Sequence, residues 1–210
     1  MKKIEGLYVI TDESLINQEE YFDIIESVLA TRPNLLQLRI KNSSFDVILD
    51  KAKKIKSLTK KYNTLFIVND YIDIALESDA DGVHIGGDDL NYLDVRKKIG
   101  DNKIVGVSCY GDLNRCINFS KLGADYIAIG TPYFTKTKPD RLPTSFDTMK
   151  KITSPKMTVP IFAIGGIETS NVDQIMSTGV SGVAVINGVF SYNNPREKVI
   201  EFNSILKKFK

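Results

Sequence analysis

Short apolar runs alternate along this chain with longer segments whose apolar residues recur at helical spacing. A short apolar run bounded by polar or turn residues is typical of a buried strand, whereas apolar residues three or four positions apart are typical of a helix packed on one face. The predicted strands cover residues 6–11, 35–40, 65–69, 82–86, 103–108, 126–130, 160–165 and 182–187. The predicted helices cover residues 18–31, 44–62, 71–78, 90–99, 112–122, 145–152, 169–178 and 195–209.

A strand followed by a helix, repeated eight times, is the pattern that closes a (β/α)8 barrel, the TIM barrel. The chain has 210 residues. That length is shorter than the roughly 250 residues typical of the fold, so the loops are expected to be short. No linker, low-complexity tract or change of composition divides the sequence. We therefore predict one α/β domain over residues 1–210, with a doubly wound open sheet as the alternative fold.

Capping signals agree with several of these boundaries. Ser44 is placed to cap the second helix, and Thr169 or Ser170 to cap the seventh. Gly179 follows the seventh helix as a C-cap residue would, and Pro195 lies in the first turn of the last helix.

Charge and hydropathy restrict the partners and the compartment. The 28 basic and 26 acidic residues give a formal net charge of +2, which argues against nucleic acid as the main partner. No apolar run approaches the roughly 18 residues that span a bilayer, so no membrane partner is expected. Cys109 and Cys116 are the only cysteines, and their spacing fits no common metal or redox motif. The expected setting is cytoplasmic, and the sequence leaves a homo-oligomer open.

Three polar residues share one side of the second predicted strand. Gln37, Arg39 and Lys41 alternate with apolar residues, so in a barrel they face the interior near its top. Two cations in a partly dry interior repel each other unless an anion joins them. The pair therefore indicates a bound phosphate or pyrophosphate. The alternative is a structural ion pair with an acidic residue from a neighbouring strand.

Carboxylates follow the next two predicted strands. Asn69-Asp70 ends the third strand, and Asp88-Asp89 follows the fourth. Two carboxylates beside a phosphate site are what Mg²⁺ needs, because this ion is usually held by one or two carboxylates and substrate phosphates. The alternative is helix capping, by Asp70 for the third helix and by Asp88 or Asp89 for the fourth.

The last three strands end in loops suited to anions. Thr135-Lys136-Thr137-Lys138 offers hydroxyls and amines, and the loop over residues 131–143 is a candidate lid. Gly165-Gly166 and Asn187-Gly188 end strands seven and eight, where many barrels bind phosphate through backbone N–H groups.

His84 is the only histidine and lies inside the fourth predicted strand. We expect it to be buried and hydrogen-bonded, in a structural role. A metal-dependent sugar-phosphate epimerase with several histidine ligands is therefore not favoured. Cys109 is expected to be a packing residue.

Taken together, these segments resemble the thiamine phosphate synthase family. The resemblance covers nearly the whole chain, and its pieces occur in order: Gln37-Leu38-Arg39-Ile40-Lys41, Phe66-Ile67-Val68-Asn69-Asp70, Asp81-Gly82-Val83-His84-Ile85-Gly86, Asp89, Gly106-Val107-Ser108, Gly123-Ala124-Asp125-Tyr126, Thr135-Lys136-Thr137-Lys138, Ile164-Gly165-Gly166-Ile167 and Gly182-Val183-Ala184-Val185-Ile186.

The resemblance implies a transferase that joins 4-amino-5-hydroxymethyl-2-methylpyrimidine pyrophosphate to 4-methyl-5-(2-phosphoethyl)thiazole, with Mg²⁺ as cofactor. The products are thiamine phosphate and pyrophosphate, and the implied mechanism is dissociative. The implied catalytic residues are Arg39, Lys41, Ser108 and Lys138; the substrate-binding residues are Gln37, Asn69, Thr135, Thr137, Gly166, Ile186 and Asn187; the metal ligands are Asp70 and Asp89.

The chain departs from the family pattern at a few positions. Gly87 stands where glutamine is usual, Tyr71 where arginine is usual, and Asn187 where serine is usual. These departures keep open a non-catalytic barrel that binds phosphate ligands. A thiazole tautomerase, a paralogue that relies on a histidine after strand five, is disfavoured because that neighbourhood reads Ser108-Cys109-Tyr110.

Overall fold

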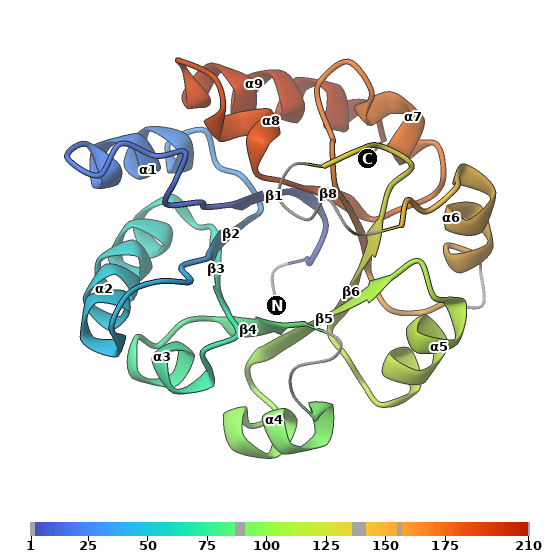
Figure 1. Ribbon diagram of the computed structural model, residues 1–210, viewed down its shortest axis with the longest axis horizontal. Coiled ribbons are helices and arrows are strands. Elements are labelled where there is room, and N and C mark those ends of the chain that lie inside the picture. The colour runs from blue at the N-terminus through green and yellow to red at the C-terminus, as the bar shows by residue number, and fades with distance from the viewer. Residues whose placement is uncertain (1–2, 87–90, 136–141, 155–156, 210) are drawn as a thin grey trace.

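The computed structural model describes residues 3–86, 91–135, 142–154 and 157–209, and its strands close into a parallel barrel (Figure 1). Each strand pairs in parallel with the next, and β8 pairs with β1. The predicted TIM barrel is therefore confirmed, and the open sheet is excluded. The strands are β1 (Gly6–Ile10), β2 (Leu35–Leu38), β3 (Leu65–Asn69), β4 (Gly82–Ile85), β5 (Ile104–Tyr110), β6 (Tyr126–Gly130), β7 (Ile161–Ile164) and β8 (Gly182–Val185).

Helices surround the barrel, and each predicted helix has a counterpart (Figure 1). They are α1 (Tyr21–Leu29), α2 (Phe45–Tyr62), α3 (Ile72–Glu77), α4 (Tyr92–Ile99), α5 (Leu113–Lys121), α6 (Phe146–Ile152), α7 (Val172–Met176) and α9 (Pro195–Leu206), which runs into a 3-10 turn at Lys207–Phe209. Sequence analysis missed the short helix α8 (Asn187–Phe190) between β8 and α9. A helix of four residues is too short to show a helical period, so no sequence pattern marked it.

Side chains alternate along the strands between two apolar cores. Leu36, Leu38 and Ile40 belong to the outer core between strands and helices. Inside the barrel, the rings of Tyr8, Tyr126 and Phe162 meet edge to face, with centroids 5.4–5.7 Å apart. The predicted orientation of the second strand is confirmed, because its apolar residues face the helices. Aromatic rings and aliphatic side chains together fill the interior of the barrel.

The capping predictions have mixed outcomes. Pro195 is the first residue of α9, as predicted, and Gly179 follows α7 with a positive φ of 89°. Ser44 is the N-cap residue of α2, but its side chain makes no capping hydrogen bond. The prediction for Thr169 or Ser170 is wrong, because α7 begins only after Asn171. The turn before it is instead stabilised by that asparagine, whose side chain accepts from Glu168 N and donates to Gly166 O.

A regular set of hydrogen bonds ties the strands together at their amino ends. The residue immediately before each even-numbered strand accepts, through its side chain, the backbone N–H at the start of the preceding odd-numbered strand. We call these four acceptors the lower rim. Each of these hydrogen bonds joins the starts of two neighbouring strands. The lower rim therefore stabilises closure of the barrel. The bonds are Leu7 N to Asn34 Oδ1 (3.2 Å), Phe66 N to Asp81 Oδ2 (2.7 Å), Val105 N to Asp125 Oδ2 (2.7 Å) and Ile161 N to Ser181 Oγ (3.1 Å).

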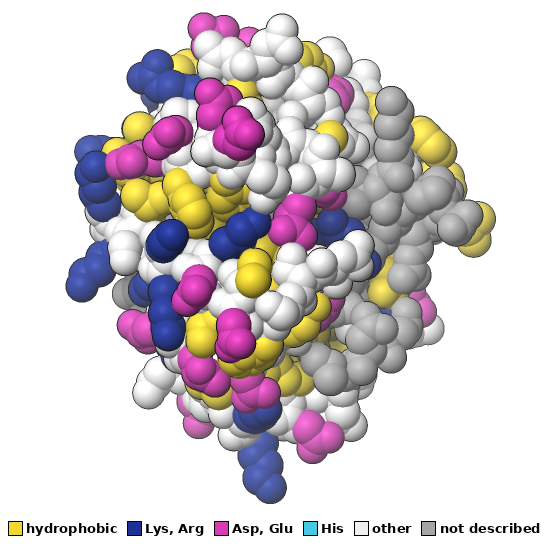
Figure 2. All heavy atoms as spheres, turned by 60° about the vertical axis from the view of Figure 1, so that its left-hand side comes forward, with side chains coloured by type: hydrophobic (Ala, Val, Ile, Leu, Met, Phe, Trp, Pro, Cys, Tyr) yellow, Lys and Arg dark blue, Asp and Glu magenta, His cyan; other side chains and the backbone are white. Residues whose placement is uncertain are grey.

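The surface around α1 and α2 carries charges of both signs. Basic and acidic side chains are intermixed there (Figure 2), and ion pairs such as Lys51–Glu13 (3.3 Å) and Lys61–Glu26 (2.7 Å) connect neighbouring elements. This face presents no single-sign field. Within the described residues, none of the helices is long and apolar enough to cross a membrane.

Candidate active site

A cavity opens at the carboxyl ends of the strands, and every strand of the barrel contributes to its lining. This is the face where TIM-barrel enzymes place their chemistry. Three of the residues predicted for the site, Asp89, Thr137 and Lys138, lie outside the described residues. All the others line this one cavity: Gln37, Arg39, Lys41, Asn69, Asp70, Ser108, Thr135, Gly166, Ile186 and Asn187.

Arg39 lies just beyond β2 and forms an ion pair across the barrel edge. Its Nη1 donates to Asp12 Oδ2 at 2.9 Å, and both side chains are only about one-sixth exposed. Its backbone N–H donates to Thr11 Oγ1 at 3.1 Å. The ion-pair alternative is thus correct for Arg39, with an acid that follows β1. Among the described residues only Nη1 of the guanidinium has a partner, so Nη2 and Nε remain available to an anion in the cavity.

Lys41 lies two residues further along and also lines the cavity, but it is exposed. Asp12 offsets only one of the two positive charges. Asp70, at the end of the neighbouring strand β3, carries a second negative charge. A cation held by Asp70 would leave this side of the cavity positive and suited to an anionic ligand.

Asp70 adopts a backbone conformation that is rare outside glycine. Its φ is 61°, and a tight turn brings Tyr71 N to 2.7 Å from Asn69 O. The carboxylate accepts from Asn69 Nδ2 at 2.5 Å and from Gly86 N at 3.4 Å. A left-handed conformation costs about 1–2 kcal/mol for most residues, and such residues cluster at functional sites. Asp70 is thereby directed at the cavity.

The capping alternative is wrong for Asp70. Helix α3 begins after Tyr71 without any side-chain cap, so Asp70 does not cap it. The N-cap residue of helix α4 is Asn91, whose Oδ1 accepts from Leu93 N at 2.9 Å, and Asp88 and Asp89 lie outside the described residues.

A divalent cation at Asp70 would need further oxygen donors from a bound ligand. The described residues hold no cluster of three or more acidic, histidine or cysteine side chains. Mg²⁺ does not need such a cluster, because it is usually held by one or two carboxylates, waters and substrate phosphates. The carboxylate of Asp70, which lines the same cavity as Arg39 and Lys41, matches that requirement.

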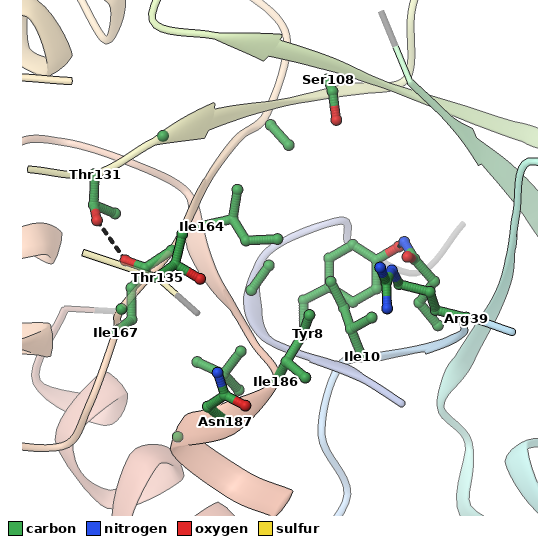
Figure 3. Close-up of a pocket in the computed structure, with 18 of the residues that line it drawn as sticks. Tyr8, Ile10, Arg39, Ser108, Thr131, Thr135, Ile164, Ile167, Ile186 and Asn187 are labelled. Carbon is green, nitrogen blue, oxygen red and sulfur yellow. Dashed lines mark hydrogen bonds between the residues drawn. The ribbon is translucent and has the colours of Figure 1, made fainter. Parts of the chain in front are cut away.

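The opposite part of the cavity is built largely from backbone. Figure 3 shows Thr135, Ile167 and Asn187 on one side and Arg39 on the other, with Tyr8 between them. Gly166 has a φ of 58°, and a Cβ there would lie 2.3 Å from Phe134 O. Only glycine therefore lets the segment after β6 approach the end of β7 this closely.

Asn187 is the first residue of α8, the helix that sequence analysis missed. The N–H groups of a helix's first turn have no partner within the helix. Those of Asn187 and Gly188 lie beside the cavity, next to Gly166. This region can accept a phosphate through backbone donors.

The start of the candidate lid is firmly anchored. The Thr131 hydroxyl donates to Gly165 O, Tyr133 N donates to Thr131 Oγ1 at 3.2 Å, and Tyr133 OH donates to Gln174 Oε1 at 2.7 Å. Beyond residues 136–141, which are outside the described part, Leu142 lines the cavity while being 92% exposed. A large apolar side chain at the mouth is suited to covering a bound ligand.

The floor of the cavity is a line of hydrogen-bonded side chains. Gln37 Nε2 donates to Tyr8 Oη at 2.6 Å, and Tyr8 Oη lies 2.8 Å from Tyr126 Oη. His84 Nδ1 is 3.0 Å from Tyr126 Oη, and His84 Nε2 is 2.9 Å from Ser108 Oγ. The prediction that His84 is buried and hydrogen-bonded is confirmed, since it is only 8% exposed.

Several cavity residues were not predicted from the sequence. Tyr8 lies in the first strand, and its inward face was predictable from alternation alone. Tyr110 follows a register irregularity between β5 and β6 and has a φ of 58°, and bulges of this kind are common next to active sites. Glu168 was not singled out because it follows the paired glycines in a segment read as a loop. Cys109, between Ser108 and Tyr110, is fully buried in the outer core, as expected of a packing residue.

Comparison with known proteins places this geometry in context. Residues 7–189 match the family model described as thiamine monophosphate synthase. A thiamine-phosphate synthase from Picrophilus torridus is 37% identical over 206 residues, covering 98% of each chain. One from Ruminiclostridium cellulolyticum is 39% identical over 198 residues, covering 93% of each. The solved structure of thiamine phosphate pyrophosphorylase from Pyrococcus furiosus superposes with a TM-score of 0.88 at 32% identity, covering 97% of this chain and 96% of that one.

Proposed function

The chain belongs to the thiamine monophosphate synthase family of transferases, and from that membership we propose the reaction and the role of each site residue. The proposed reaction joins 4-amino-5-hydroxymethyl-2-methylpyrimidine pyrophosphate to 4-methyl-5-(2-phosphoethyl)thiazole. The thiazole nitrogen forms a bond to the pyrimidine methylene carbon, and the bond from that carbon to the pyrophosphate oxygen breaks. Thiamine phosphate and pyrophosphate leave.

One observation carries the proposal. A single cavity has a cationic side at Arg39 and Lys41 and a separate backbone-donor side at Gly166 and Asn187. A reaction between two substrates that each bear a phosphate group needs two anion sites within reach of one another. Ile10, Ile164 and Ile186 line the same cavity, and their side chains can pack against the flat rings of the two substrates.

The cationic side is the proposed pyrophosphate site. The two nitrogens of Arg39 that have no partner among the described residues, and the ammonium of Lys41, would stabilise negative charge as it develops on the leaving group. Asp70 would hold Mg²⁺, and the ion would supply further charge neutralisation on the pyrophosphate. Asp89 as the second ligand and Lys138 as a third cation remain part of the proposal, although both lie outside the described residues.

Polar side chains next to this region would orient the pyrimidine. The carbonyl and second N–H of Gln37 have no partner among the described residues and line the cavity, so they can bond the ring nitrogen and amino group. Asn69, fixed by its bond to Asp70, offers a second amide. Ser108 is proposed to contact the leaving group.

The thiazole substrate would occupy the opposite side. Its phosphate would accept from backbone N–H groups at Gly166, Ile186 and Asn187, while Thr135 lines the wall beside its ring. Thr137, outside the described residues, is proposed to contact the same substrate.

The proposed mechanism is dissociative, and the chain's role is then mainly to stabilise charge and exclude water. The electron-rich pyrimidine carries positive charge once the pyrophosphate leaves, and the thiazole nitrogen captures it. No side chain has to act as a nucleophile. Ile10, Ile164 and Ile186 line the cavity between the two anion sides and limit the access of water to the cation.

The direct test is pyrophosphate release with both substrates, with each alone, and with and without Mg²⁺. The proposal expects release that requires both substrates and the metal, with one thiamine phosphate formed per pyrophosphate. Binding of both ligands without release would identify a non-catalytic barrel. Proton exchange into the thiazole without any pyrimidine present would identify a tautomerase.

A further inference from the structure

Five side chains under the cavity form one continuous hydrogen-bonded line, which we call the floor chain. It runs from Gln37 through Tyr8, Tyr126 and His84 to Ser108. The line connects the second strand to the fifth across the barrel interior. Its two ends, Gln37 and Ser108, both face the cavity.

The middle of the floor chain is sealed from solvent. Tyr8 is 1% exposed and Tyr126 is fully buried. Burial raises the pKa of both phenols well above the usual value, so both remain protonated. Each hydroxyl has one proton and can therefore donate only one hydrogen bond, so the direction of one bond fixes the next.

The direction is set at Gln37. Its Nε2 donates to Tyr8 Oη, so the Tyr8 proton is left for Tyr126. Tyr126, having accepted from Tyr8, donates to His84 Nδ1. An Nδ1 atom that accepts carries no proton, so the proton of the neutral imidazole is on Nε2 and is donated to Ser108 Oγ.

The opposite direction leaves a buried proton without an acceptor. If His84 Nδ1 donated to Tyr126, then Tyr126 would donate to Tyr8. Tyr8 would accept from both Gln37 and Tyr126, and among the described residues no other polar atom is within hydrogen-bond distance of its hydroxyl. An unsatisfied buried donor is costly, so the direction toward Ser108 is favoured.

We infer that His84 is a positioning residue: held as the Nε2–H tautomer by the floor chain, it fixes the Ser108 hydroxyl as a hydrogen-bond donor aimed into the cavity. Ser108 accepts from the imidazole and can then direct its own proton only elsewhere. The cavity is the open side of Ser108, so this proton meets the departing pyrophosphate oxygen. The identity of that ligand rests on the proposed function. The tautomer of His84 does not, because it follows from the hydrogen bonds of the floor chain alone.

A purely structural histidine would behave differently. Packing alone requires the ring shape and one hydrogen bond, and it does not depend on which nitrogen carries the proton. The floor chain instead requires a defined tautomer. The hydroxyl of Tyr126 touches no substrate. In the floor chain it can therefore affect the reaction only through its effect on Ser108.

The tautomer can be read directly, because His84 is the only histidine in the chain. In the ¹⁵N-labelled protein, the inference expects Nδ1 to resonate as an unprotonated nitrogen and Nε2 as a protonated one. Tyr126→Phe keeps the ring of the aromatic cluster and removes the donor to Nδ1, so the Nδ1–H tautomer should become populated. Tyr92→Phe is the matched control, since Tyr92 is also buried but its hydroxyl accepts from Arg96 and lies outside the floor chain.

The role in the reaction is tested by a double-mutant cycle on pyrophosphate release. Tyr126→Phe should lower kcat by about 3- to 10-fold, the range expected for one hydrogen bond, with little change in KM. Ser108→Ala should lower kcat by about 10²-fold. If Tyr126 acts through Ser108, the double variant should be no slower than Ser108→Ala alone.

Conservative variants of His84 separate its hydrogen bond to Tyr126 from its hydrogen bond to Ser108. In His84→Gln the amide nitrogen can replace Nε2 as the donor to Ser108, so part of kcat should be retained. In His84→Asn the shorter amide can replace only Nδ1, so Ser108 loses its donor and kcat should fall about as far as in Ser108→Ala. Thermal unfolding of each variant checks that it is folded.

Two results would overturn the inference. One is an Nδ1–H tautomer in the unsubstituted protein, and the other is fully additive losses from Tyr126→Phe and Ser108→Ala. Failure of the proposed function would look different, because the unsubstituted protein would then release no pyrophosphate. The ¹⁵N spectrum would still decide the direction of the floor chain in that case.

Discussion

Aspartates stand at both ends of the barrel, and their surroundings are opposite. Asp125, at the lower rim, accepts from Val105 N at 2.7 Å and pairs with Arg96, which is itself held by the carbonyls of Gly100 and Lys103. Asp70, at the upper end, accepts from Asn69 Nδ2 and, at 3.4 Å, from Gly86 N, and it is held in a left-handed conformation beside the cavity. Asp125 is bound by a cation and a strand N–H of the protein, whereas Asp70 has only neutral donors and lines the cavity.

The difference between these two aspartates shows that the role of a polar residue depends on whether it precedes or follows a strand. Residues just before a parallel strand lie at the amino end, where backbone donors of the neighbouring strand need acceptors. Residues just after a strand lie at the carboxyl end, where the loops form a cavity. Substitutions at Arg39, Asp70, Asp125 and Asn187 test this division.

Arg39→Ala should have the largest effect on catalysis. It removes a cation from the proposed pyrophosphate side of the cavity and leaves the charge of Asp12 without its counter-ion. We expect kcat/KM for the pyrimidine substrate to fall by roughly 10²–10³-fold, as for loss of a preorganised electrostatic group. Steady-state kinetics measures it, with the exposed Arg196→Ala as control. Activity within a few-fold of the unsubstituted protein would remove Arg39 from the site.

Asp70→Asn should produce a metal-dependent loss. Asparagine tolerates the left-handed conformation, so the backbone is preserved while the charge is removed. We expect activity at a fixed low Mg²⁺ concentration to fall by about 10²-fold. Added Mg²⁺ should restore part of it. An unchanged dependence of rate on Mg²⁺ would show that Asp70 does not hold the ion.

Asp125→Ala should affect stability and leave the chemistry intact. It removes the acceptor of Val105 N and the partner of Arg96 at the far end from the cavity. The free energy of unfolding should fall by about 2–3 kcal/mol. Urea unfolding measures this, and the exposed Asp50→Ala serves as the control, with a change below about 0.5 kcal/mol. The folded Asp125→Ala protein should keep its kcat/KM, and a specific loss of activity would contradict the division between the two ends.

Asn187 should show the smallest effects, and they should depend on charge. Since the phosphate is proposed to bind backbone N–H groups there, Asn187→Ala should change KM for the thiazole substrate by only about twofold. Asn187→Asp has the same shape but places a negative charge beside the phosphate, so KM should rise by about tenfold. Equal effects of the two variants would show that the side-chain amide itself binds the phosphate.

Much of this organisation was predictable from sequence, for identifiable reasons. Strand period and helix period are local, so the eight repeats and the inward side of Gln37 follow from the residues themselves. The pairing of Arg39 with Asp12, by contrast, depends on how two strand ends meet across the barrel. The helix α8 has too few residues to show a pattern.

The hydrogen bonds of the floor chain were likewise not predictable from the sequence. Its members come from strands far apart in sequence, so only the closed fold could reveal that His84 connects Tyr126 to Ser108. The lower rim is a related case. Asp81 and Asp125 contributed to the family resemblance, but only the structure shows that they bind strand N–H groups.

The central claim is that two substrates bind through different means on two sides of one cavity, and equilibrium binding without turnover tests it most directly. ³¹P NMR can follow inorganic pyrophosphate with Mg²⁺, and separately the thiazole phosphate, in the unsubstituted protein, Arg39→Ala and Asn187→Asp. We predict that Arg39→Ala weakens pyrophosphate alone and Asn187→Asp weakens the thiazole phosphate alone. If either variant weakened both ligands equally, or the two effects were exchanged, the two-sided cavity would be contradicted.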